Sequence, residues 1–149
     1  MELKNDVFNH VVSLQIRFND IDRLGHVNNA VVQEFFDLGR ISYFNDTLGD
    51  LLGKDGQQLV IVSYKTDFYR QIMPYDEVEV RTKIYKLGNK SIRMWQWIAL
   101  VGEGSPKAIN DSVLSGFYSG TDKSMVIPDE WRQIFHVFEK NMLILDKDQ

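Results

Sequence analysis

One abrupt change of hydrophobic period constrains the fold of this chain more than any other feature. From His10 to Phe18 apolar and polar residues alternate, which is typical of a half-buried strand. After Asn29 the apolar residues recur at three- and four-residue steps up to Leu48, which predicts a long helix with a broad apolar face. Such a helix needs another layer of structure to cover that face.

The rest of the chain predicts mainly strands. Alternating or continuous apolar runs indicate four of them, at residues 59–69, 78–84, 92–101 and 108–118. The run at 59–69 is apolar on both faces at its start, as expected for a central strand, and the last three strands follow one another through short turns. An apolar stripe from Trp131 to Phe138, behind Pro128, predicts a short C-terminal helix.

These elements imply an α+β fold in which one antiparallel sheet of about five strands packs around one long helix. The length of 149 residues fits one domain, and no linker or repeat divides residues 1–149. A long strand at the edge of such a sheet invites pairing with another copy. We therefore expect a dimer with one continuous sheet.

The composition narrows the chemistry. The chain has no cysteine, which excludes disulfides, thiolate metal sites and cysteine nucleophiles and agrees with a reducing compartment. A formal charge of -4 predicts no general attraction to nucleic acid. No signal-peptide-like start occurs, and no apolar run approaches the roughly 20 residues of a membrane span. We expect a soluble cytoplasmic protein without a nucleic-acid or membrane partner and without a cofactor.

The junction between the first strand and the long helix, residues 19–29, reads NDIDRLGHVNN and concentrates reactive groups. Gly25 permits a tight bend, and Asn28 or Asn29 suits the N-cap of the helix. The first amides of a helix are unpaired and carry partial positive charge, so they can hold an oxygen on which negative charge develops. A nearby carboxylate, for which Asp22 is well placed, can attack a carbonyl carbon or activate water.

The same residues can also have purely structural roles. Aspartates such as Asp20 and Asp22 commonly form turns or bind backbone amides. A lone loop histidine such as His26 is more often a structural hydrogen-bonding residue than a base. A metal site built from these three residues would lack a second histidine at ligand spacing, so no metal site is predicted.

The segment RFNDIDRLGHVNNAVVQEFFDLGRISYF, residues 17–44, resembles the signature of the 4-hydroxybenzoyl-CoA thioesterase-like branch of the hotdog-fold acyl-CoA thioesterases. The shared pattern is D-x-D-x-x-G-H-V-N-N in front of a helix, and the order of elements is similar over about residues 8–140. The resemblance implies a hotdog fold, with the sheet wrapped around the long helix. It also implies a homodimer or a dimer of dimers, and hydrolysis of an acyl-CoA thioester to free acid and CoA.

The resemblance also assigns roles in the motif. It implies that Asp22 acts as nucleophile or general base and that the amide of Asn28 or Asn29 polarises the thioester carbonyl. We count His26 among the catalytic candidates because it lies close to Asp22 in the motif. Val32 stands where related sequences commonly have a tyrosine, so no tyrosine hydroxyl orients the substrate from that position.

The turn YKLGNKSIR, residues 85–93, offers cations to the phosphates of a CoA ligand. Lys90 and Ser91 match the hairpin where this family often holds the nucleotide, so we predict that they bind substrate. Lys86 and Arg93 flank them, and an ordinary solvated hairpin is the alternative interpretation.

Two further pairs complete the candidates. Ser63 and Thr66 lie on the strand predicted to cross the dimer interface, and Ser63 is a candidate contact of the substrate or of the catalytic carboxylate. Asp37 and Arg40 have the spacing of an ordinary surface ion pair on the helix.

Two other functions stay open from the sequence. A hotdog-fold enoyl-CoA hydratase or dehydratase would use an aspartate or glutamate with a histidine, and the nearness of Asp22 to His26 fits this chemistry. A non-catalytic acyl-ligand-binding module would use the loop only to cap the helix. The sequence determines neither the acyl chain nor whether CoA or an acyl carrier protein carries it.

Overall fold

The computed structural model describes residues 7–140 and 143–144. Its sheet runs in the order β1 (His10–Leu14), β3 (Val78–Leu87), β4 (Ser91–Leu100), β5 (Ala108–Tyr118) and β2 (Gln57–Phe68), with all four of these pairs antiparallel. A short β6 (Leu143–Ile144) pairs in parallel with β3. The helices are α1 (Asn29–Thr47) and α2 (Asp129–Glu139), and single 3-10 turns occur at Phe18–Asp20, Gly49–Leu51 and Lys54–Gly56.

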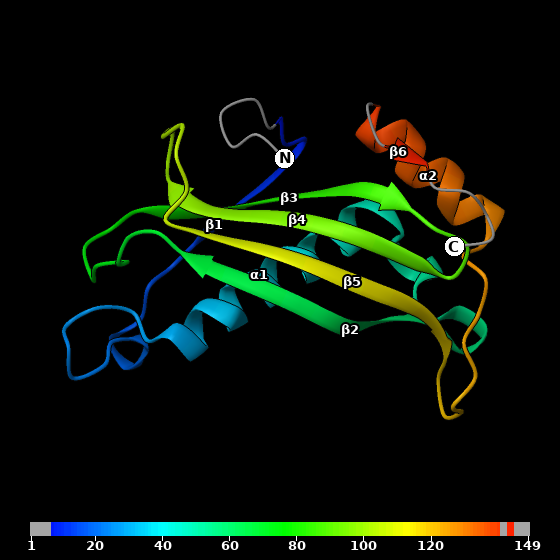
Figure 1. Ribbon diagram of the computed structural model, residues 1–149, viewed down its shortest axis with the longest axis horizontal. Coiled ribbons are helices and arrows are strands. Elements are labelled where there is room, and N and C mark those ends of the chain that lie inside the picture. Colours follow the sequence, from blue (N-terminus) through cyan, green and yellow to red (C-terminus); the bar gives the residue numbers. More distant parts are fainter. Residues whose placement is uncertain (1–6, 141–142, 145–149) are drawn as a thin grey trace.

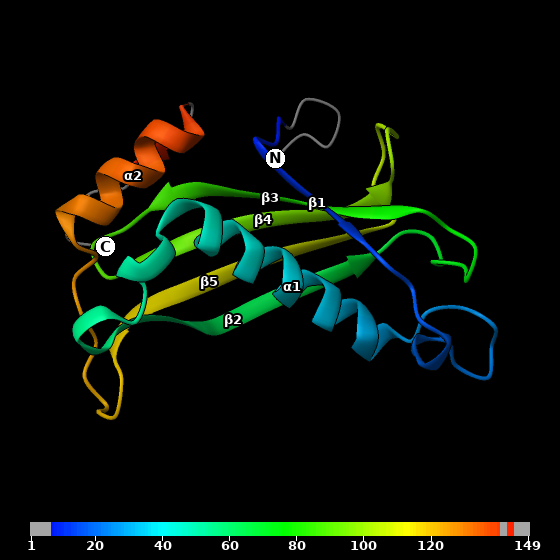
Figure 2. The same ribbon diagram turned by 180° about the vertical axis from the view of Figure 1, so that it is seen from behind.

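Helix α1 lies along one face of the sheet, which curves around it (Figures 1 and 2). Most of the apolar face predicted for this helix is buried against the strands, through Val32, Phe35, Phe36, Tyr43 and Phe44. Leu38 and Ile41, which belong to the same predicted face, are 52% and 58% exposed. Helix α2 packs near the end of β3, beyond the C-terminal half of α1 (Figure 2). The predicted α+β arrangement of a sheet around one long helix is therefore confirmed.

Gly39 allows α1 to approach the sheet closely. A Cβ atom at this position would lie 2.4 Å from Cγ1 of Val80 and 2.9 Å from Nε2 of Gln96. Both distances are shorter than any normal contact, so a larger residue would push the helix away from β3 and β4.

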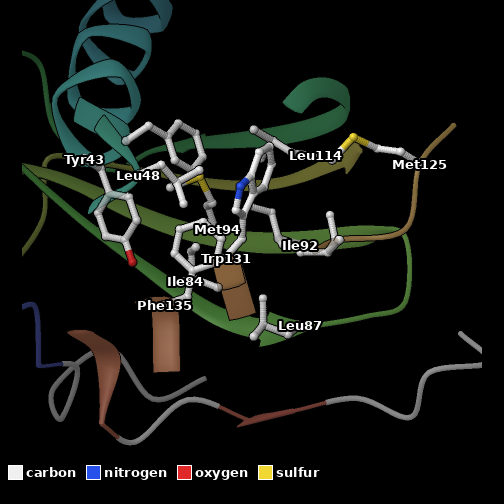
Figure 3. Close-up of a cluster of buried hydrophobic side chains, with 12 residues drawn as sticks. Tyr43, Leu48, Ile84, Leu87, Ile92, Met94, Leu114, Met125, Trp131 and Phe135 are labelled. Atoms are coloured by element: carbon white, nitrogen blue, oxygen red, sulfur yellow. The ribbon is translucent and has the colours of Figure 1, made fainter. Parts of the chain in front are cut away.

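The core has two parts along α1. One lies under the C-terminal half of the helix, where Tyr43 and Leu48 meet Trp131 and Phe135 of α2 and the strand residue Met94 (Figure 3). The other lies under the first half and contains Val27, Val32, Phe35, Phe36, Ile72, Val78, Val80, Ile98 and Ala108. The second part supports the start of the helix. None of the helices in the described ranges is both long and apolar enough to cross a membrane.

The first strand ends earlier than the alternation predicts, at Leu14 rather than Phe18. Asp20 provides the physical reason, because its carboxylate accepts hydrogen bonds from the backbone amide of Arg17 at 2.7 Å and from the Arg17 guanidinium at 3.0 Å. These bonds close a 3-10 turn over Phe18–Asp20, and the chain leaves the sheet there.

The strand predicted to be central, β2, lies at an edge of the sheet. Within the described residues it pairs with β5 on one side alone. Its apolar side chains Val60, Val62 and Tyr64 are 39%, 60% and 53% exposed. The sequence of β2 therefore predicts a strand buried on both faces, whereas in a single chain much of this strand is exposed to solvent.

Glu139 at the end of α2 contacts β3 at Ile84, between the part of β3 that pairs with β1 and the part that pairs with β6. Its carboxylate Oε2 accepts hydrogen bonds from the hydroxyl of Tyr43 and from the amide of Ile84, the latter at 2.9 Å. Burial raises the pKa of the Glu139 carboxyl above its ordinary value of 4.5, and these two bonds together with the nearby Lys83 and His10 oppose that rise. Glu139 thus joins α2 to the sheet through a carboxyl group whose charged form is disfavoured by burial.

Replacing Glu139 with glutamine is expected to change how stability depends on pH. Because the pKa is higher in the folded state, the stabilising contribution of Glu139 is present below pH 4.5 and is lost as pH rises through the folded pKa. Glutamine does not ionise, and its carbonyl oxygen can accept the same two bonds. The unfolding free energy of Glu139→Gln relative to wild type should therefore rise across this pH range in urea titrations.

Glu139→Ala is the matched comparison. It leaves the Tyr43 hydroxyl and the Ile84 amide without their acceptor, which should cost about 1–3 kcal/mol of unfolding free energy relative to Glu139→Gln at every pH. A parallel pH dependence of wild type and Glu139→Gln would contradict the assignment.

Candidate active site

The loop before α1 folds as a small hairpin. Ile21 and Val27 form an isolated antiparallel bridge, and the amide of Asp22 donates to the carbonyl of His26 at 3.0 Å. Gly25 closes the turn with φ of 86° and donates its amide to the Asp22 carbonyl at 3.1 Å. The bend predicted at Gly25 is present, and it folds Asp22 back beside the residues that lead into the helix.

Asp22 is half-buried, and its two carboxylate oxygens differ. Oδ1 accepts a hydrogen bond from the amide of Leu24 at 2.9 Å, which is the turn-forming contact that aspartate commonly makes. Oδ2 has no hydrogen-bond partner in the part of the chain that the structure describes. One oxygen of this carboxylate is therefore structural and the other is available.

Asp20, by contrast, is a structural anchor. Its side chain is 1% exposed and forms an ion pair with Arg17 at 3.0 Å. Burial alone would raise the pKa of the Asp20 carboxyl, but the hydrogen bonds and charge of Arg17 outweigh it and hold the pKa below its ordinary value. Its carbonyl also accepts from the amide of Asn28 at 2.9 Å, which ties the turn to the start of α1.

The two asparagines at the start of α1 have separate roles. Asn28 is the N-cap, because its Oδ1 accepts from the amide of Ala30 at 2.8 Å. Its own amide is already bonded to Asp20. The amide of Asn29 has no acceptor among residues 7–140 and 143–144. Of the two amides that the motif suggested for a carbonyl oxygen, the one at Asn29 is available.

A cleft of about 370 Å³ opens at this end of α1. It is lined by Leu24, His26, Val27, Asn29, Val32, Phe68, Tyr69, Arg70, Gln71, Ile72 and Ala108. Nδ1 of His26 lies 3.2 Å from the carbonyl oxygen of Val27, and a carbonyl only accepts, so Nδ1 carries the proton in this contact. Asp22 does not line the cleft in the single chain, although the next residues of its loop do.

No pattern in the sequence predicted that residues 68–72 form one wall of a cleft beside α1. This wall is placed by long-range bonds: the amide of Val27 donates to the carbonyl of Ile72 at 2.8 Å. Nζ of Lys107, which is buried, donates to the carbonyl of Gln71 at 2.8 Å and pairs with Asp76 at 2.7 Å. Arg70 also lines the cleft, and its guanidinium donates to Oγ of Ser105 at 3.0 Å.

The structure does not bring the predicted substrate-binding residues to this cleft within one chain. Ser63 is exposed at a register shift of β2 and pairs with Val113, on the face of the sheet away from α1. Lys90 is exposed in the β3–β4 turn, where its Nζ lies 3.3 Å from Oγ of Ser124, and Ser91 begins β4.

That turn lies at the opposite end of the sheet from the cleft (Figure 2). The pairing row of Ala108 and Phe68 is at the cleft, whereas Ser91 pairs with Ser115. Seven residues of β5 separate the two rows, which corresponds to roughly 24 Å. Among the described residues, no group of three or more His, Asp or Glu side chains could hold a metal ion.

Comparisons with known proteins point to one family. The model of the Thioesterase-like superfamily matches residues 16–135. A thioesterase from Thermus thermophilus, solved in complex with coenzyme A and zinc, is 31% identical with a TM-score of 0.79, over 91% of this chain and 98% of that one. A predicted thioesterase from Bacillus stearothermophilus is 28% identical with a TM-score of 0.77, over 87% and 96% of the two chains. The hotdog fold predicted from the motif is confirmed.

A curated relative matches over a shorter length. The uncharacterised protein YsmA of Bacillus subtilis (strain 168) is 31% identical over 88 residues. This match spans 58% of each of the two chains.

Proposed function

This chain belongs to the thioesterase-like superfamily, and from this premise we propose that it hydrolyses an acyl-CoA thioester to a free acid and CoA. The observation that carries the proposal is the available amide of Asn29 at a cleft, close in the chain to a half-buried Asp22 with one available oxygen. This combination supplies a donor for a developing oxyanion and a group that can attack or activate water.

In the proposed reaction the thioester carbonyl oxygen accepts a hydrogen bond from the Asn29 amide, at the positive end of α1. Asp22 then either attacks the carbonyl carbon or removes a proton from the water that attacks it. The carbon–sulfur bond breaks and the CoA thiolate leaves. In the first case a mixed anhydride forms on Asp22 and water hydrolyses it; in the second the acid forms directly. His26 lines the cleft and completes the catalytic candidates.

We place the complete site in a dimer formed through β2. The unpaired edge and exposed apolar side chains of β2 favour antiparallel pairing with β2 of a second copy. Such pairing sets the far end of one sheet beside the cleft of the other. Within one chain the β3–β4 turn lies roughly 24 Å from the cleft. In the dimer, Lys90 and Ser91 of the second copy would instead approach the cleft of the first. Arg70 would supply a further cation for CoA phosphates.

Val62→Lys is expected to separate the dimer into monomers and to abolish most thioester hydrolysis. Val62 is 60% exposed on β2, so lysine is tolerated by the single chain, but two copies would place like charges close together in the interface. Analytical ultracentrifugation measures the mass, and a thiol-release assay measures the activity.

The control is Val137→Lys, which adds the same charge at a position 62% exposed on α2. It should leave mass and activity unchanged. A Val62→Lys variant that keeps both the mass and the activity of wild type would show that β2 is not the interface.

The function itself is tested by release of free CoA thiol from a panel of acyl-CoA esters that includes an enoyl-CoA. Hydrolysis produces free thiol, whereas a hydratase consumes the enoyl-CoA and leaves the thioester intact. Binding of the esters without turnover would instead identify a non-catalytic acyl-ligand module.

A further inference from the structure

A chain of four polar side chains crosses the interface between α1 and the sheet. The guanidinium of Arg40 donates to Oδ1 of Asn110 at 3.1 Å, and Nδ2 of Asn110 donates to Oγ1 of Thr66 at 2.9 Å. Oγ1 of Thr66 donates in turn to Oε1 of Gln33 at 3.0 Å. Arg40 is 5% exposed and Asn110 is 0% exposed, whereas Thr66 and Gln33 are half-buried, so the chain runs from the core towards solvent.

The direction of every bond in this chain follows from its buried end. A guanidinium can only donate, so Asn110 must present its carbonyl oxygen to Arg40 and its amide hydrogens to Thr66. The Thr66 hydroxyl accepts that bond, and its single proton then goes to the carbonyl oxygen of Gln33. This orientation leaves Nε2 of Gln33 as a donor, without an acceptor among the residues that the structure covers. Aligned bonds polarise one another, so the buried cation strengthens this donor.

Gln33 lies close to the proposed oxyanion amide along α1. It follows Asn29 by one helical turn, so both residues project from one side of the helix, separated by about 6 Å along its axis. Val32, the residue next to it, lines the cleft.

The pairing of the strands also places the polar chain beside the cleft. Phe68 and Ala108 line the cleft and pair with each other across β2 and β5. Thr66 and Asn110 form a pair of the same kind two residues deeper, on the same face of the sheet. The half-buried end of the polar chain, at Thr66 and Gln33, therefore lies next to the lining of the cleft.

We propose, resting on the function proposed above, that Gln33 is a specificity-determining residue that donates a hydrogen bond to an oxygen atom of the acyl group. The preferred substrates are then short acyl thioesters that carry a carbonyl or carboxylate oxygen a few carbons from the thioester, within reach of one helical turn. A purely aliphatic acyl group fits less well, because it would leave the Gln33 donor desolvated and unpaired.

The test compares three thioesters of equal chain length: hexanoyl-CoA, 5-oxohexanoyl-CoA and adipoyl-CoA. Wild type is expected to show a kcat/KM about tenfold higher for each oxygen-bearing ester than for hexanoyl-CoA, measured by thiol release. Gln33→Leu should abolish this preference, because it lowers kcat/KM for the two oxygen-bearing esters and raises it for hexanoyl-CoA, which no longer leaves a desolvated donor unpaired. Gln133→Leu, the same substitution at an exposed site on α2, should preserve the preference.

Each other result overturns the inference. Equal kcat/KM for all three esters in wild type, or a preference that survives in Gln33→Leu, would reject Gln33 as the specificity residue and leave the thioesterase function standing. A preference for adipoyl-CoA alone would assign recognition to a charge such as Arg70 rather than to a neutral donor. Absence of thiol release from every ester would overturn the proposed function, and the inference with it.

Discussion

Asp22→Asn is expected to lower kcat for acyl-CoA hydrolysis by about 10²–10⁴-fold, the usual contribution of a positioned acid–base group. An amide neither attacks a thioester carbonyl effectively nor takes a proton from water. The loop should keep its conformation, because Oδ1 of asparagine can accept the same bond from the Leu24 amide that Asp22 accepts at 2.9 Å. The measurement is thiol release at saturating substrate, together with the midpoint of thermal unfolding.

The matched control is Asp122→Asn, the same substitution in the exposed loop between β5 and α2. It should have wild-type activity and stability. Turnover by Asp22→Asn at a rate close to wild type, on a good substrate, would remove Asp22 from the mechanism and leave the cleft and the Asn29 amide to be explained in another way.

Arg40→Met is expected to have the largest effect on stability, lowering the free energy of unfolding by about 2–6 kcal/mol, because each of two buried acceptors left unpaired costs about 1–3 kcal/mol. Methionine fills a similar volume but leaves Oε1 of Gln96 and Oδ1 of Asn110 in the core without the donors that Arg40 supplies at 2.7 and 3.1 Å. Urea unfolding at one fixed protein concentration measures the change, because the proposed dimer would make stability depend on concentration.

Asp37→Asn provides the comparison for this experiment. Asp37 pairs with Arg40 but is 56% exposed, and asparagine can still accept the bond, so its loss of charge should cost less than about 1 kcal/mol. Similar losses for the two variants would show that the pair acts as the ordinary surface ion pair suggested by its spacing. The structure instead makes Arg40 the centre of a buried hydrogen-bond network.

The long helix, the order of the strands along the chain and the bend at Gly25 were predictable because each depends on residues within a few positions of one another. The capping role of Asn28 was predictable for the same reason, although the sequence did not distinguish it from Asn29. The end of the first strand at Leu14 was not, because an ion pair between the exposed Arg17 and the buried Asp20 overrides an alternation that continues past it.

The sequence by itself determined the α+β class, the family and the motif that carries Asp22, because period, turn chemistry and motif spacing are local properties. Only the tertiary structure decided which groups can meet. It joined the wall around Arg70 to the start of α1, left the Asn29 amide available by bonding that of Asn28 to Asp20, and put Lys90 at the other end of the sheet. These relations depend on strand pairing between segments far apart in the chain, which local patterns do not encode.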